Sequence, residues 1–168
     1  PNSVRMLMQL AALRDYQRQD VEAENVYKQI LSADPNNVLA NNNLAWLLAM
    51  REGGNRQKAL ELIEAAIKYR GPVAEFLDTR ATVHMSLGKA KAAITDLKEA
   101  ISATEDNKNM YFNLAQAYLM ADDFSEAKRA LAMAQQLGLT ETDLHPREWE
   151  AYRNLLRRLG FDDSSRKG

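Results

Sequence analysis

The sequence predicts an all-α solenoid, built from four copies of a helical hairpin and followed by one further helix. Alanine recurs in two rows that run in step along the chain, at nearly equal intervals. The rows are Ala23, Ala59, Ala93 and Ala127, and Ala11, Ala45, Ala81 and Ala115. A period of about 34 residues indicates a repeated hairpin, because one copy is too small to bury its apolar face and must stack on its neighbours. The sequence lacks the alternating β-branched runs that predict strands.

Glycines and prolines mark the ends of the expected helices. The 7 glycines fall between apolar-periodic segments or at the end of the chain, and Pro35, Pro72 and Pro146 stand at segment starts. The predicted helices span residues 4–17, 20–33, 37–50, 56–69, 73–87, 90–103, 108–121, 124–137 and 146–159. They form a single domain over 1–160, with repeats at about 4–37, 38–72, 74–107 and 108–138, and we expect 161–168 to be a flexible tail.

One hairpin departs from the strict period. The two alanines of a hairpin have the same separation in three repeats, whereas Ala45 and Ala59 lie two positions farther apart. Two residues are therefore inserted in the turn of the second hairpin. We expect the glycine-rich stretch from Met50 to Asn55 to protrude as a mobile loop.

The last predicted helix has one apolar side and one charged side. Its apolar stripe consists of Trp149, Tyr152, Leu155, Leu156 and Leu159, and its charged side of Arg147, Glu148, Arg153, Arg157 and Arg158. An open solenoid end exposes apolar surface, so this helix is expected to cap the fourth hairpin. A dimer contact is the alternative role. The first hairpin has no comparable cap, so we also expect self-association through the N-terminal end.

Composition excludes several classes of function. The chain has 168 residues, a formal net charge of -1 and no cysteine. This balance gives no electrostatic reason to expect nucleic acid, and the lack of cysteine excludes disulfides and thiolate catalysis. No apolar run is long enough for membrane insertion. Pro1, Asn2 and Ser3 are similar to the end of a preceding repeat, so we expect a longer array, either cytoplasmic or exported with a signal before residue 1.

The alanine pattern resembles that of the tetratricopeptide repeat, a hairpin of about 34 residues with small residues at its eighth, twentieth and twenty-seventh positions. The eighth and twentieth positions are alanine in all four repeats, and the twenty-seventh are Ile30, Ala66, Ala100 and Ala134. Arg14, Asn41 and Arg80 depart from the pattern. A finer resemblance, in NNLAWLLA, LDTR and LHPREWEAYRNLL, is to tetratricopeptide proteins of bacterial export and exopolysaccharide systems. The resemblance implies a right-handed α-solenoid.

The resemblance also implies a binding groove, because in this family the first helix of each hairpin lines the concave face. The groove residues carried over are Met8, Ala12, Asn42, Trp46, Ala49, Asp78, Thr82, Met85, Phe112, Gln116 and Leu119. Trp46 and Phe112 are the expected anchors, since aromatic side chains dominate binding surfaces. The lysine and asparagine set with which family members grip a chaperone's C-terminal carboxylate is missing. We therefore expect an amphipathic helix or an extended peptide with apolar side chains.

Charged residues outside the groove are interpreted as structural. Arg80 stands where the other repeats have leucine, so its guanidinium needs an acceptor, and Asp96 on the paired helix is the candidate. His84 and His145 have no neighbours at metal-ligand or triad spacing. We expect no catalytic residue, no metal and no cofactor.

The sequence thus predicts a non-catalytic protein-interaction scaffold whose partner is a protein or peptide, without nucleic acid. Two alternatives stay open. The chain is a regulatory or substrate-recruiting domain of a larger enzyme or export assembly, or it is a structural module that associates with itself.

Overall fold

The computed structural model describes residues 3–104 and 106–161. The part of the chain that it describes contains nine α-helices, one short 3-10 helix and no strand. Their bounds are α1 Val4–Tyr16, α2 Asp20–Ala33, α3 Val38–Met50, α4 Arg56–Arg70, α5 Ala74–Ser86, α6 Ala90–Ala103, α7 Lys108–Met120, α8 Phe124–Gln136, η1 Glu141–Asp143 and α9 Trp149–Leu159. The predicted tail at 162–168 lies outside the described residues.

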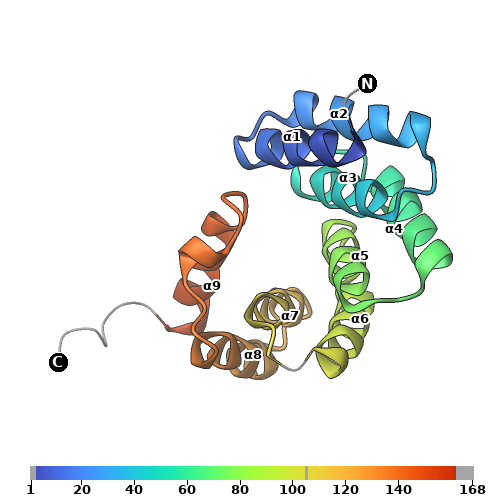
Figure 1. The fold of residues 1–168 in the computed structure, drawn as a ribbon. Helices are drawn as coiled ribbons and strands as arrows, with labels where there is room; N and C mark the ends of the chain where they lie inside the picture. The colour runs from blue at the N-terminus through green and yellow to red at the C-terminus, as the bar shows by residue number, and fades with distance from the viewer. Residues whose placement is uncertain (1–2, 105, 162–168) are drawn as a thin grey trace.

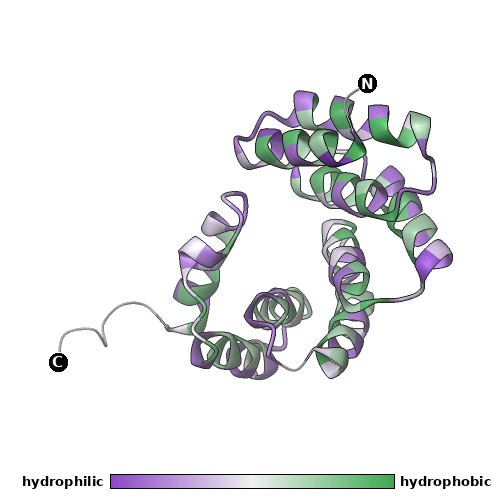
Figure 2. Ribbon diagram, viewed as in Figure 1, coloured by the Kyte–Doolittle hydropathy of each residue, from purple (hydrophilic) through white to green (hydrophobic). Residues whose placement is uncertain are grey.

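The first eight helices form four antiparallel hairpins that stack into a curved array (Figure 1). The second helix of each hairpin packs on the first helix of the next, and α5 also packs on α3 and α7. Helices α6 and α8 carry their hydrophobic residues on one side, whereas α3 and α5 have buried residues around most of their circumference. Figure 2 shows hydrophobic and hydrophilic residues mixed along the stacked helices. The all-α solenoid predicted from the repeat period is confirmed.

Alanine provides the close contacts between helices. All eight alanines of the two rows have 0% exposed surface, because a methyl side chain lets two helix axes approach closely. Larger side chains such as Tyr27, Ile63, Leu97 and Leu131 fill the remaining space and are almost fully buried. Leu10, by contrast, keeps 37% of its surface exposed, since no described hairpin precedes it.

Side chains before the first turn of several helices satisfy free backbone N–H groups. Asn37 accepts a hydrogen bond from the Ala40 amide at 3.1 Å, and Asn107 accepts one from the Met110 amide at 3.2 Å. Ser3 caps α1 in the same way at 3.3 Å. The equivalent residue of the third hairpin is Val73, which makes no such cap. The N-capping residues therefore recur with the repeat, as the alanines do.

The turn of the second hairpin lies partly against the array, although Glu52 and Gly53 at its tip are exposed. Gly54 is buried against α3, where an added Cβ would lie 2.0 Å from the Leu48 carbonyl oxygen. Arg51 reaches back to the first hairpin and forms an ion pair of 2.7 Å with Glu24. Gly54 and Arg51 therefore hold part of this turn on the array, because glycine permits an approach that a side chain would block.

The three departures from the repeat pattern each have polar partners. Arg14 donates to the Gln19 side chain at 2.6 Å. The buried amide of Asn41 donates to the carbonyl oxygens of Pro35 and Asn37 at 3.0 and 3.1 Å. These hydrogen bonds replace the apolar contacts that the pattern provides in other copies.

The third departure is the predicted pair of Arg80 and Asp96. Arg80 donates from Nε and Nη2 to the two carboxylate oxygens of Asp96 at 2.8 and 2.6 Å. His84 Nε2 lies 3.7 Å from the same carboxylate. This bidentate pair fixes α5 against α6 inside the third hairpin.

The C-terminal helix begins later than predicted and turns back across the array. Tyr152, Leu155 and Leu159 are buried in the cluster that includes the fourth hairpin. Figure 1 shows the chain leaving α8 toward the first hairpin, from where α9 runs back toward α8. Helix α9 starts at Trp149 instead of residue 146, so residues 144–148 form a bend and turn. We call residues 144–148 the C-terminal strap.

Candidate functional site

The predicted groove residues divide into two groups in the structure. Met8, Ala12, Asn42, Trp46, Asp78, Met85 and Gln116 are exposed or half-buried, whereas Ala49, Thr82, Phe112 and Leu119 are buried. The first group is accessible in part to a partner. The second group belongs to the packing of the array.

Phe112 is not an accessible anchor, contrary to expectation. It has 0% exposed surface, and its ring centroid lies 5.8 Å from that of Tyr152 in an edge-on arrangement. Helix α9 therefore covers the part of the concave face where a partner was expected to contact Phe112. The repeat pattern could not predict this burial, because α9, which covers Phe112, lies outside the repeats.

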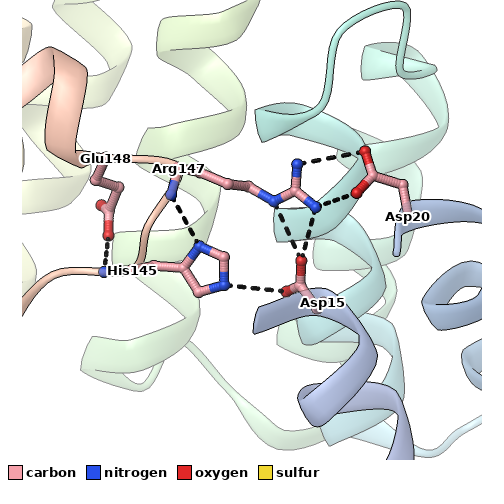
Figure 3. Close-up of polar contacts among 5 residues, drawn as sticks. All are labelled: Asp15, Asp20, His145, Arg147 and Glu148. Atoms are coloured by element: carbon pink, nitrogen blue, oxygen red, sulfur yellow. Dashed lines mark hydrogen bonds and ion pairs between the residues drawn. The ribbon is translucent and has the colours of Figure 1, made fainter. Parts of the chain in front are cut away.

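Arg147 of the C-terminal strap is inserted between two aspartates of the first hairpin (Figure 3). Its Nε and Nη2 lie 3.2 and 3.1 Å from Asp15 Oδ1. Its Nη1 lies 3.3 Å from Asp20 Oδ2, and its Nη2 also donates to Asp20 Oδ1. The Arg147 side chain is only 3% exposed. The last segment of the fold is thereby bonded to the first, as a fork-shaped guanidinium permits.

His145 lies between two aromatic rings of the concave face. Its ring centroid is 4.7 Å from that of Trp46 on α3 and 5.7 Å from that of Tyr16 on α1, both nearly perpendicular. Inside the strap, the Arg147 amide donates to His145 Nδ1 at 3.2 Å, and the His145 amide donates to Glu148 at 3.0 Å. These two hydrogen bonds, visible in Figure 3, hold the strap as a tight turn. Trp46 is therefore half-buried because its own chain covers it.

Two carboxyl groups near the strap are protonated more easily than usual. Burial raises the pKa of Glu148 to about 7, opposed by the hydrogen bond from the His145 amide and reinforced by the charge of Asp78. Burial also raises the pKa of Asp78 to about 6, although Asn113 donates to its carboxylate at 2.8 Å. The fold is therefore less stable when Glu148 and Asp78 are both charged.

Burial affects the charges at the first hairpin as well. It lowers the pKa of His145 to about 4, and the positive charge of Arg147 acts in the same direction. It raises the pKa of Asp15 more than Arg147 lowers it. Asp15 and Arg147 therefore form an ion pair that loses much of its hydration on closure of the strap.

The role of Arg147 was missed because the sequence places it on the charged side of a continuous helix. Asp15 and Asp20 carry no local pattern that distinguishes them from solvated charges. The contact joins residues 132 and 127 positions apart. The available signal was the proline at 146, since the residue before a proline rarely continues a helix.

The described residues hold no cluster of three or more histidine, cysteine, aspartate or glutamate side chains suited to a metal ion. Among the same residues, no helix combines the length and apolar character needed to span a bilayer.

The comparisons with known proteins agree with this architecture. Residues 84–159 match the family model of the tetratricopeptide repeat. Human tetratricopeptide repeat protein 6 is 31% identical over 106 residues, which are 63% of this chain and 20% of that protein. The chain therefore spans about a fifth of the length of this curated relative.

Solved structures are similar in fold. The thermophilic tetratricopeptide protein TTC0263 of Thermus thermophilus has a TM-score of 0.76 at 21% identity, covering 94% of this chain and 83% of that chain. PilW, a type IV pilus biogenesis factor, has a TM-score of 0.73 at 18% identity, covering 98% and 81%. The chain is therefore an α-solenoid similar in fold to tetratricopeptide repeat proteins, and residues 84–159 match that family's model. Such repeats are typically protein-interaction scaffolds.

Proposed function

We propose that the concave face of this solenoid binds a peptide or helix of a partner protein without chemical conversion. The observation that supports it is the strap itself. An irregular segment is held on α1, α2 and α3 by a buried arginine and by a histidine that contacts two aromatic rings. A surface that binds one such segment in the same chain has the contacts needed to bind another.

Unused hydrogen-bond acceptors on the same face support the proposal. Asn42 Oδ1 and Asn109 Oδ1 are buried, and no donor reaches either among the described residues. A buried acceptor without a donor costs free energy. An extended peptide carries backbone N–H groups that would satisfy these acceptors, whereas a flat globular surface would not reach them.

Panning a random peptide display library on the immobilised full chain tests this function. Peptides enriched by the wild type should bind Trp46→Ala at least tenfold more weakly, because the indole forms part of the peptide surface. Tyr69→Ala is the matched control, since Tyr69 is 67% exposed at the end of α4. Equal affinity of the selected peptides for the two variants, or no enrichment at all, would contradict a concave binding face.

Self-association is a second candidate role. Met6, Leu10 and Leu13 on α1 and Val21 on α2 are 59%, 37%, 51% and 63% exposed. These apolar side chains lie on the first described hairpin, which no described hairpin covers. Sedimentation at several concentrations tests this role, and a Met6→Lys/Leu13→Lys variant should shift any dimer to monomer.

The setting of the module is also a proposal. The match to a much longer relative supports the alternative in which this chain is a recruiting module of a larger enzyme or assembly. The finer resemblance of its motifs to export and exopolysaccharide systems favours an export assembly. Copurification of the full-length protein with neighbouring export components tests this setting.

A further inference from the structure

We propose that Asp15 and Asp20, together with the rings of Tyr16 and Trp46, form a recognition site for an arginine-containing peptide, and that Arg147 is its internal competitor. This inference rests on the proposed function and specifies the chemistry of the partner. The strap then represents the closed state of the site, and a partner binds by displacing it.

The geometry of the two aspartates selects arginine over other side chains. The carboxylates come from the end of α1 and the start of α2, and three guanidinium nitrogens of Arg147 contact them. A planar fork with five N–H donors can bridge two carboxylates in this way, whereas the ammonium group of lysine is a single point charge. Loss of Arg147 would leave two negative charges close together without the guanidinium that joins them.

The aromatic rings define a second position, two residues before the arginine. His145 occupies the space beside Tyr16 and Trp46. The expected partner segment therefore carries a planar or apolar side chain, one intervening residue and then arginine. This spacing is a property of the surface, because the rings belong to α1 and α3 and the carboxylates to α1 and α2.

The strap itself is an imperfect occupant. His145 Nε2 is buried without a hydrogen bond and lies 4.0 Å from Asp15 Oδ2. Glu148 is buried, with the charge of Asp78 close enough to affect its ionisation. A partner that places an apolar ring beside Trp46 and no carboxylate near Asp78 would avoid both costs. A segment that is held by few and partly unfavourable contacts, such as the strap, dissociates readily from the surface.

Competition within one chain has a measurable consequence. A tethered segment acts at an effective concentration in the millimolar range, about 1 mM for short linkers. A free peptide must overcome this concentration before it binds the wild type. Removal of the Arg147 guanidinium should therefore increase the affinity for a free arginine peptide, in contrast to the usual effect of deleting a buried residue.

The test uses a fluorescent, end-blocked peptide with the sequence of residues 143–149, Asp-Leu-His-Pro-Arg-Glu-Trp, as the probe. Full-length Arg147→Ala should bind it at least tenfold more tightly than the wild type or Arg153→Ala. Arg153 is the matched control because it pairs with Glu141 outside the groove, at 2.7 and 2.6 Å. Replacing the peptide's arginine with glutamine should weaken binding to Arg147→Ala at least tenfold, and so should Asp15→Asn/Asp20→Asn added to that variant.

Arg147→Lys keeps a positive charge at the site in case Arg147→Ala fails to fold. It should bind the probe more tightly than the wild type, because lysine competes less well. Equal binding of the arginine and glutamine peptides to either folded variant would overturn the inference, as would no binding to a variant that still unfolds cooperatively in denaturant.

The two proposals fail in different ways. Display-selected peptides that depend on Trp46 but are indifferent to Asp15→Asn/Asp20→Asn would support the peptide-binding face and overturn the arginine site. Peptides whose binding depends on neither would contradict both.

Discussion

Arg147 and Asp15 are 132 residues apart in the chain and lie 3.1 Å apart in the structure. Together with Asp20 they join the strap to the first hairpin across the concave face. In a repeat array, stabilising contacts ordinarily join only neighbouring repeats. This contact adds a direct connection between its two ends.

Arg147→Ala should lower the free energy of unfolding by about 3 kcal/mol, the lower end of the cost of breaking a buried ion pair, because Asp20 keeps some contact with solvent. Hydrogen exchange should increase most in α1 and α2. Denaturant unfolding measures the first effect and mass spectrometry of exchanged peptides the second. Arg153→Ala should lower the free energy of unfolding much less, since the ion pair between Arg153 and Glu141 is solvated. Equal losses would show that the Arg147 contacts add no stability.

The contribution of Glu148 to the stability of the closed strap should decrease as pH rises from about 4.5 to 7. Glu148 has its pKa raised from 4.5 to about 7 in the fold. A group with a raised folded pKa contributes its full stability below the unfolded value and loses it as pH rises through the folded value. Asp78, whose pKa is raised to about 6, acts with the same sign.

Glu148→Gln should make stability less dependent on pH over this window, because the amide still accepts the hydrogen bond from the His145 amide. Urea midpoints at pH 5, 6, 7 and 8 provide the measurement. Glu150→Gln on the exposed side of α9 is the control and should leave the pH dependence unchanged. A Glu148→Gln variant whose midpoint depends on pH as the wild type's does would contradict this interpretation.

His145 should titrate near pH 4 in the wild type, since burial lowers its pKa. Its depressed folded pKa means that the closed strap keeps the histidine's contribution above about 6.5 and loses it as pH falls through about 4. Trp46→Ala should raise the midpoint toward 6.5, because removal of the indole exposes the imidazole. NMR of the imidazole protons measures the midpoint. The His84 resonance should stay unchanged, which separates a local effect from unfolding.

Asp96→Ala should destabilise the third hairpin by about 3 kcal/mol, because it leaves the half-buried Arg80 without its carboxylate. The double variant Arg80→Leu/Asp96→Ala should recover most of this loss, since the other three repeats carry leucine at the equivalent position. Urea unfolding of both variants and the wild type provides the measurement. A double variant as unstable as Asp96→Ala would mean that the pair does more than fill an apolar position.

The concave face was only partly predictable. Trp46 and Asn42 are half-buried, and the candidate groove set as a whole stays a proposal. Phe112 lies under α9 instead, and Arg147 leaves the charged side of its expected helix. Both differences have one cause, because the repeat pattern describes contacts between adjacent hairpins and contains no information about a segment that folds back over them.

The sequence by itself determined the four hairpins, their buried alanine rows and the replacement of a leucine by Arg80 paired with Asp96, because each depends on neighbours within about one repeat. Only the tertiary structure decided that the strap crosses to Asp15 and Asp20. Curvature of the stacked array brings its two ends within reach of a single side chain, and this curvature is the sum of small rotations at every interface. No residue pattern in the chain encodes that sum locally.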